Sequence, residues 1–247
     1  MREGSPSLAD ELTPGLLGEL LSLLAHDLRN PLSALHSNVG FVGSLIERSD
    51  KDAQEAIADA LLSCDGLSHI IDNLEVLAHV LTGTNDFDAA PFALATVVND
   101  TLNRTQALAK SHEVELSLDE ASLRLHERVT AHREMAGKAL AALVRNAVQH
   151  APPGSVVRID IRVDPDRCHV RIQDEGTALT EEVVDAAFTA AGQISTKGAR
   201  GGRYSRGLGL YCARVCADAA GAQISAQSSS EGGNVFLLSL DREKRTG

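Results

Sequence analysis

Helical periodicity governs the first third of the sequence. Between residues 15 and 48, apolar side chains recur at spacings of three and four, which places them in one stripe along a helix. The polar segment SDKD at 49–52 interrupts this stripe, and a second run with the same spacing follows through 57–81. Two helices of about thirty residues with so short a connection predict an antiparallel hairpin. The first stripe contains Leu17, Leu21, Leu24, Leu28, Leu32, Leu35, Val39, Val42 and Ile46.

A hairpin of this kind buries only one seam by itself. Both stripes close most economically when a second copy completes a four-helix bundle, so a homodimer is the first hypothesis. The alternative is an ordinary hairpin that docks on the rest of its own chain. Periodicity alone gives these two interpretations equal weight.

His26 lies off the apolar stripe and is expected to face water. Asp27 follows it directly, and Asn30 lies one turn further on, on roughly the same face. Pro31 removes the amide that would bond to residue 27, which should loosen or kink the helix beside the histidine. A lone histidine in this position is most simply a solvated helix residue. Here a carboxylate, a carboxamide and an irregular backbone accompany the imidazole, which favours a chemical role.

The pattern changes after GTNDFDAAP at 83–91, which has the composition of a linker. We expect a flexible lead over residues 1–14, a helical hairpin over 15–84 and a second domain over 85–247. In that domain one sheet should be covered on one face by helices, an α/β sandwich. Helices are expected at 94–110, 132–150, 181–190 and 208–219, and strands at 114–118, 123–129, 156–163, 169–173, 222–226 and 234–240.

Charge and composition exclude several classes of partner. Residues 1–82 carry 13 acidic and 4 basic side chains, and the chain has no Trp, so neither nucleic acid nor an anionic lipid surface is expected to bind. No apolar run approaches the ~20 residues that cross a bilayer, and the start of the sequence lacks the apolar core of a signal peptide. We therefore expect a cytoplasmic protein without membrane insertion. The cysteines are expected in the core, although Cys212 and Cys216, one turn apart, leave a redox or metal pair open.

Four motifs together resemble the sensor histidine kinases. HDLRNP, from His26 to Pro31, resembles their H-box. An N-box-like stretch (LAALVRNAVQHAPPGS, 140–155), a G1-like stretch (DEGTAL, 174–179) and a G2-like stretch (RGLGL, 206–210) follow in the order typical of that family. The resemblance implies a dimeric four-helix bundle followed by a Bergerat-type ATP-binding domain. Its cofactors would be ATP and Mg²⁺.

The resemblance also implies a nucleotide site. Asp174 matches the family aspartate that holds the adenine amino group, and Gly176 would let the backbone approach the purine. Asn146 matches the asparagine that coordinates Mg²⁺ between the phosphates. His150 would be a second contact near the phosphates, with a helix-end histidine facing the helix dipole as the equal alternative. The segment Gly207, Leu208 and Gly209 would present free amides to phosphate oxygens.

Other features of the second domain bear on the strength of this site. Lys197, Arg200, Arg203 and Arg206 lie in a loop without acidic residues, which suits a lid over a triphosphate; a solvated basic loop is the alternative. Three positions depart from the family pattern: Ala142 replaces a second N-box asparagine, and Ala178 and Ser205 replace glycines. These departures bear on nucleotide affinity and turnover more than on fold.

The predicted function is that of a cytoplasmic histidine kinase. ATP would phosphorylate His26 in the dimer, and the phosphoryl group would pass to an aspartate of a response-regulator receiver domain. Asp27 would orient the imidazole and accept its proton, while Asn30 could position water in a phosphatase reaction. A separate sensor protein would supply the input. The alternatives are a histidine phosphotransfer protein with a degenerate ATP-binding domain and an Hsp90-like module, which would not need HDLRNP.

Overall fold

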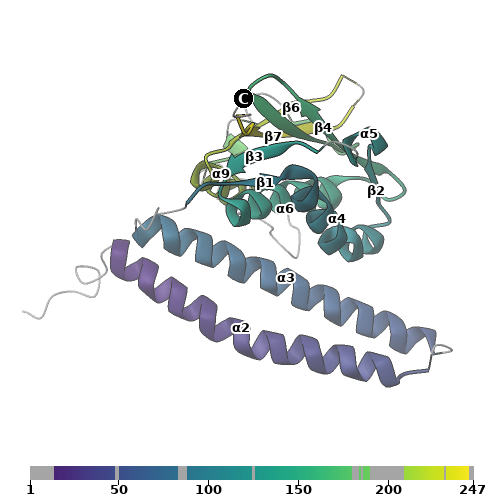
Figure 1. Cartoon of the computed structure of the whole chain (residues 1–247). Coiled ribbons are helices and arrows are strands. Elements are labelled where there is room, and N and C mark those ends of the chain that lie inside the picture. Colours follow the sequence, from purple (N-terminus) through teal and green to yellow (C-terminus); the bar gives the residue numbers. More distant parts are fainter. Residues whose placement is uncertain are drawn as a thin grey trace, which may run out of the picture. The chain divides into compact units, whose positions relative to one another are not determined.

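The computed structural model divides the chain into two compact units, Met1–Asn85 and Asp86–Gly247 (Figure 1). The structure describes residues 14–47, 50–82, 88–123, 126–179, 184, 186–189, 209–230 and 232–244.

The first unit is the predicted helical hairpin. Helix α2 spans Pro14–Leu45 and α3 spans Lys51–Thr82, and the two run antiparallel (Figure 1). Helix α2 continues through Pro31. The proline therefore does not end the helix; it removes one intrahelical hydrogen bond, the one that residue 27 would accept.

The seam between the two helices includes two small residues of α2, Gly18 and Ala25. Gly18, Ala25 and Leu32, spaced by seven, are the buried residues of α2. A Cβ added at Gly18 would lie 2.8 Å from Cγ2 of Thr82 and 2.9 Å from the Ala78 carbonyl oxygen, so the helices meet closely there. Most of the leucine stripe is left outside this seam, because Leu17 and Leu24 each precede a seam residue and are thus rotated by about 100° around the helix.

Partly exposed ion pairs join α2 to α3. Nη2 of Arg29 lies 3.0 Å from Oδ1 of Asp72 and 3.0 Å from Oε1 of Glu75. About two turns further along, Nε2 of His36 lies 3.8 Å from Oδ1 of Asp65. Arg29 is the only charged member of HDLRNP besides Asp27, and its contacts hold this segment to the second helix.

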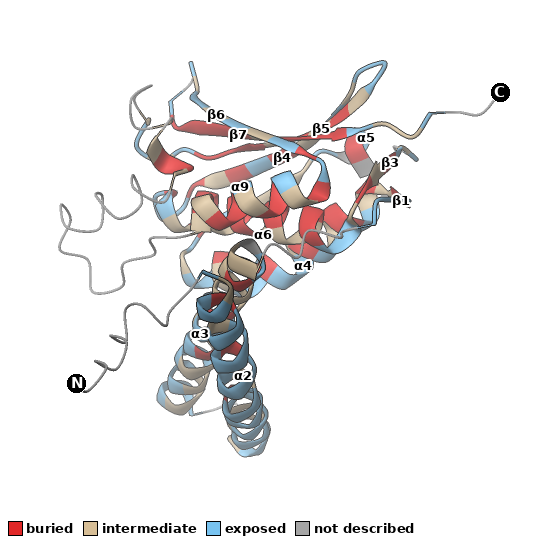
Figure 2. Cartoon of the chain, turned by 90° about the vertical axis from the view of Figure 1, so that its left-hand side faces the viewer, coloured by how far each residue is buried: buried red, intermediate tan, exposed pale blue. Residues whose placement is uncertain are grey.

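The second unit is the predicted α/β sandwich. Its five-stranded sheet has the order β2-β4-β5-β7-β6, in which β2 is parallel to β4 and the other neighbours are antiparallel. Helices cover one face of this sheet (Figure 2). The strands are β2 (Glu115–Leu118), β4 (Val156–Val163), β5 (Arg167–Gln173), β6 (Gln223–Ser228) and β7 (Asn234–Asp241), and the helices are α4 (Leu94–Ser111), α6 (Arg133–His150) and α9 (Gly209–Ala220).

Buried and half-buried side chains alternate along the strands, so one face of the sheet belongs to the core and the other is open. In β5, Cys168, Val170 and Ile172 are fully buried, whereas Arg167, His169 and Arg171 are only half-buried. On the helical side, Leu140, Leu143 and Val144 of α6 are at most 1% exposed. The core therefore lies between the sheet and α4, α6 and α9.

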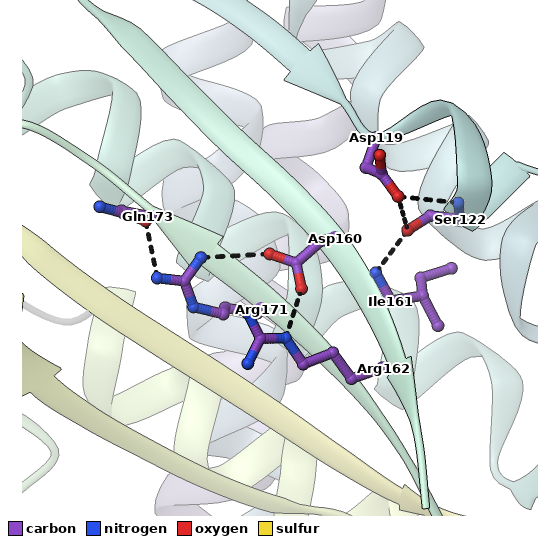
Figure 3. A network of polar contacts seen from close by, with 7 residues as sticks. All are labelled: Asp119, Ser122, Asp160, Ile161, Arg162, Arg171 and Gln173. Carbon is purple, nitrogen blue, oxygen red and sulfur yellow. Dashed lines mark hydrogen bonds and ion pairs between the residues drawn. The ribbon is translucent and has the colours of Figure 1, made fainter.

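Polar side chains are paired across the open face of the sheet (Figure 3). Asp160 accepts from Nη1 of Arg171 at 3.1 Å and from Nε of Arg162 at 2.9 Å. Arg171 also donates to Oε1 of Gln173 at 2.6 Å. The guanidinium of Arg171 thus links β4 with the last residue of β5, directly before Asp174.

Two local predictions were wrong. Instead of a strand at 123–129, helix α5 spans Glu120–Leu123 and strand β3 spans Arg128–Ala131. Asp119 explains the helical turn, because its Oδ2 accepts from the backbone and hydroxyl of Ser122 at 3.1 and 3.2 Å. The hydroxyl of Ser122 in turn accepts from the amide of Ile161 at 2.8 Å (Figure 3).

The second wrong prediction concerns the end of the linker. Strand β1, Ala90–Ala93, includes Ala90 and Pro91 and pairs antiparallel with β3 as a separate two-stranded sheet. Most of the helix predicted at 181–190 and all of the glycine-rich loop from 190 to 206 lie outside the described residues.

Candidate functional site

His26 is presented to solvent on α2. Its side chain is 72% exposed, and its Nδ1 lies 3.4 Å from Oδ1 of Asp27. Leu17 and Leu35 each lie nine residues away, which is two and a half turns, so the histidine lies opposite the centre of the leucine stripe. The prediction that His26 faces water is confirmed. In the tautomer that donates from Nδ1 to Asp27, the lone pair is on Nε2.

Asn30 shares this exposed face. It lies four residues after His26 and is itself exposed. An acceptor, Asp27, therefore contacts the imidazole, and an amide, Asn30, lies one turn further along. The structure places His26 and Asn30 on one exposed helical face, and Asp27 contacts the imidazole from the adjoining face.

In the second unit, Asp174 follows directly after β5 and is completely buried. Its Oδ1 accepts from the amide of Gly176 at 2.7 Å and from Nδ2 of Asn234 at 3.1 Å. Its Oδ2 is buried and has no hydrogen-bond partner among the described residues. Burial raises the pKa of Asp174, while the hydrogen bonds from residues 176 and 234 and the charge of His150 oppose this rise. The free oxygen suits a ligand that donates an N–H group.

Gly176 brings the end of α6 against this carboxylate. A Cβ on Gly176 would lie 2.6 Å from the His150 carbonyl oxygen and 3.0 Å from Oδ1 of Asp174. His150 is the last residue of α6, and half-buried Asn146 lies one turn earlier on the same face. The structure thus brings Asp174, Gly176 and His150 into one place, with Asn146 on the adjoining turn.

Sequence reasoning missed Asn234, the first residue of β7. This residue is 3% exposed, and besides Asp174 it bonds the Thr177 carbonyl oxygen through Nδ2 at 3.1 Å. Its Oδ1 accepts from the amide of Leu179 at 2.8 Å. Gly233 before it has φ of +79°, and a Cβ there would overlap the Asp174 carbonyl. The glycine pair in EGGN was the only signal in the sequence for this tight corner.

The phosphate end of the predicted site is described only in part. Gly209 is the first residue of α9, as predicted for a helix that begins at this motif. Gly207 and Leu208 lie outside the described residues, as do Ser205 and the basic side chains of Lys197, Arg200, Arg203 and Arg206. Their contact with phosphate stays a prediction.

The cysteines do not form a second site in the described part of the chain. All four are buried, and burial followed by the charge of Cys216 raises the pKa of Cys212 to about 12. A thiol with so high a pKa is a poor nucleophile and metal ligand. Within the described residues, no group of three or more His, Cys, Asp or Glu side chains is placed to hold a metal ion.

The side chains of this site fit ATP with Mg²⁺. Asp174 offers an unpartnered buried acceptor for the adenine amine, and Gly176 offers backbone without a side chain beside it. Asn146 would contribute one amide oxygen to Mg²⁺, an ion that commonly takes one or two protein ligands and completes its shell with phosphates and water.

Two family models match the chain. The His Kinase A (phospho-acceptor) domain matches residues 16–83, and the histidine kinase-, DNA gyrase B- and HSP90-like ATPase matches residues 132–244. The first match contains His26 and the whole hairpin seam. The second contains Asn146, Asp174 and Asn234.

Curated relatives extend the likeness over most of the chain. The sensor protein KdpD of Clostridium acetobutylicum is 25% identical over 235 residues, which are 92% of this chain and 25% of the relative. The circadian input-output histidine kinase CikA of Synechococcus elongatus is 28% identical over 231 residues, 90% of this chain and 29% of the relative. The chain spans between a quarter and a third of the length of these two proteins.

Solved structures share the fold. Full-length ShkA, solved in complex with AMPPNP, has a TM-score of 0.63 at 18% identity. The match covers 94% of this chain and 46% of the ShkA chain. The Acinetobacter baumannii histidine kinase AdeS has a TM-score of 0.53 at 20% identity, and the match covers 89% of this chain and 98% of the AdeS chain. None of the described helices combines the length and apolar character needed to span a membrane.

Proposed function

The chain belongs to the sensor histidine kinases, and from this premise we propose that it is an ATP-dependent protein-histidine kinase. It phosphorylates His26 and passes the phosphoryl group to an aspartate of a response-regulator receiver domain. The substrates are ATP with Mg²⁺ and the imidazole of its own hairpin.

The observation that carries this proposal is the unpartnered Oδ2 of Asp174. A buried carboxylate oxygen without a hydrogen bond costs stability, commonly about 1–3 kcal/mol. An adenine amine would supply the missing donor. The cost in the unliganded protein is understandable if the residue is kept for binding.

In the proposed reaction, the lone pair on Nε2 of His26 attacks the γ-phosphorus of ATP. A P–N bond forms as the bond to the β–γ bridging oxygen breaks, and ADP leaves with that electron pair. Asp27 stabilises the positive imidazole and takes the Nδ1 proton. Phosphoryl transfer depends chiefly on alignment and charge neutralisation, so Asn146 would act by holding Mg²⁺ at the phosphates.

Transfer onward leaves His26 free for another cycle. A receiver carboxylate attacks the phosphorus, a P–O bond forms and the P–N bond breaks, so the imidazole departs neutral after taking up a proton. The exposure of His26 supports this step because both donor and acceptor must reach it in turn. The exposed Asn30 supports a phosphatase activity, in which its amide positions water against the phosphorylated receiver.

The working form is proposed to be a homodimer. Leu17, Leu24, Leu28 and Leu35 are each at least 40% exposed within one chain, although they form one apolar stripe. Leu67 and Ile70 of α3 are exposed as well. A second hairpin would cover these side chains in a four-helix bundle while leaving the opposite face, with His26, open.

The histidine phosphotransfer alternative is not favoured, because that function has no use for a buried acceptor such as Asp174. The two functions are separated by incubating the purified chain with γ-labelled ATP, with and without Mg²⁺. A kinase acquires acid-labile, base-stable label only with Mg²⁺ present, and a candidate receiver domain then removes it. A chain that stays unlabelled but accepts phosphoryl groups from a phosphorylated receiver would overturn the proposal in favour of the alternative.

A further inference from the structure

Asn234 connects three parts of the loop that carries Asp174. Its backbone oxygen accepts from the Asp174 amide at 3.0 Å, and its side chain bonds Oδ1 of Asp174, the Thr177 oxygen and the Leu179 amide. We propose that Asn234 is a positioning residue that gives the site its preference for a 6-aminopurine by fixing Asp174 as a hydrogen-bond acceptor. This inference rests on the proposed nucleotide site.

The contacts of the carboxylate determine which oxygen is left for a ligand. Both described donors, the Gly176 amide and Nδ2 of Asn234, lie on Oδ1. Two donors on one oxygen fix the orientation of the carboxylate plane and leave Oδ2 as the only open acceptor. A purine with an amino group at position 6 satisfies that oxygen, whereas a 6-oxo purine presents a second acceptor and leaves both oxygens unpaired.

The same amide also protects the charged form of Asp174. Burial favours the neutral carboxyl, and a hydrogen bond donated by Asn234 favours the carboxylate. A protonated Asp174 would carry its hydrogen on the open oxygen and would donate it to the oxygen of a 6-oxo purine. Asn234 therefore disfavours a 6-oxo purine in two ways. It orients the Asp174 carboxylate, and it keeps that carboxylate charged.

Substitutions at 234 separate this role from simple support of the loop. In Asn234→Asp the oxygen that accepts from Leu179 is kept, but the donor to Asp174 is replaced by a second carboxylate oxygen. In Asn234→Thr a hydroxyl donor is kept on a shorter side chain. Ser239→Ala, on the same strand, removes a hydroxyl that contacts Nδ1 of His169 at 2.7 Å and lies away from Asp174, so it serves as the control.

The experiment measures binding of ADP and of inosine diphosphate, with Mg²⁺, to the full chain and to these variants by titration calorimetry. The wild type and Ser239→Ala should prefer ADP by about tenfold or more, the usual penalty for leaving a buried polar group unpaired. Asn234→Asp should reduce that ratio to about threefold or less, and Asn234→Thr should retain more of it. Melting curves establish that each variant is folded.

The outcomes distinguish this inference from the proposed function. A wild type that binds ADP selectively, with the same selectivity in folded Asn234→Asp, overturns the role of Asn234 and leaves the kinase proposal intact. Equal loss of affinity for both diphosphates, with an unchanged ratio, makes Asn234 a structural residue only and also overturns the inference. If Asn234→Asp does not fold, a folded Asn234→Thr variant with a ratio near one contradicts the inference, because its hydroxyl keeps a donor. A wild type that binds neither diphosphate overturns both proposals.

Discussion

The two units of the chain differ in how they cover their apolar side chains. In the sheet unit, Leu140, Ile172 and Phe236 are at most 1% exposed. In the hairpin, Leu24, Leu28 and Leu35 are about half exposed, although their spacing is as regular as that of any core helix. The sheet unit thus covers its apolar side chains within one chain, whereas the hairpin leaves its leucine stripe exposed.

The units also differ in where they keep their reactive groups. His26 is largely exposed, whereas Asp174 is wholly buried. In the proposed reaction, His26 is reached by ATP and by a receiver domain in succession, so exposure serves it. A carboxylate that recognises a base gains from exclusion of water, because hydrogen bonds strengthen in a low-dielectric setting.

The largest expected effect comes from breaking the uncovered stripe. Leu24→Glu combined with Leu28→Glu should raise the dissociation constant of the dimer by at least about a hundredfold, since each buried leucine contributes roughly 1.5–3 kcal/mol. Sedimentation equilibrium measures this constant. The matched control is Ser33→Glu with Ser37→Glu, which adds the same charge on the face of His26. Equal association of both double variants would mean that the stripe is not the dimer surface.

In the sheet unit, Asp174→Asn should weaken ATP binding roughly ten- to hundredfold, because the loss of one acceptor at a buried site costs about 1–3 kcal/mol. Titration calorimetry gives the affinity. Dimerisation should be unaffected, because in this account the sheet unit binds ATP and the hairpin forms the dimer. Unchanged ATP affinity would remove Asp174 from the site.

The same variant should be more stable than the wild type in the absence of nucleotide at neutral pH. The pKa of Asp174 is raised, mainly by burial, so folding disfavours its charged form. The wild type therefore loses stability relative to Asp174→Asn as the pH rises through that raised pKa, and the two should converge below the ordinary carboxyl pKa of ~3.9. Melting temperatures measured against pH test this, and a difference independent of pH would contradict it.

The smallest expected effect concerns the departure from the family pattern at Ala142. This residue is buried one turn before Asn146 on α6. Ala142→Asn should raise autophosphorylation by about tenfold or less, since one polar contact near the metal is worth on the order of 1 kcal/mol. Ala141→Asn, rotated by about 100° on the same helix, is the control. Equal rates in both variants would show that the position does not serve the site.

The hairpin could be predicted from the sequence because its signal is local. Spacings of three and four define each helix, and the side of His26 follows from counting residues. The seam through Gly18 and Ala25 was not predicted, because apolar spacing alone does not show which flank of a stripe meets the neighbouring helix. The seam depends on how closely two backbones can approach.

The α/β sandwich was predicted for the same reason. The prediction missed features that depend on contacts between residues far apart in the sequence. Strand β1 has only four residues and no alternation, and it forms through pairing with β3. Asn234 contacts Asp174 because β7 pairs with β5, sixty residues earlier. Nothing in the residues adjacent to either position indicates that contact.

The central claim is that ATP phosphorylates His26, and the most direct test compares two histidines of the same helix. Wild type, His26→Gln and His36→Gln are incubated with γ-labelled ATP and Mg²⁺, and the labelled residue is located by mass spectrometry under alkaline conditions. His36 lies ten residues further along α2 and is also exposed. The account predicts label on residue 26 in the wild type and in His36→Gln, and none in His26→Gln. Label that persists in His26→Gln would contradict it.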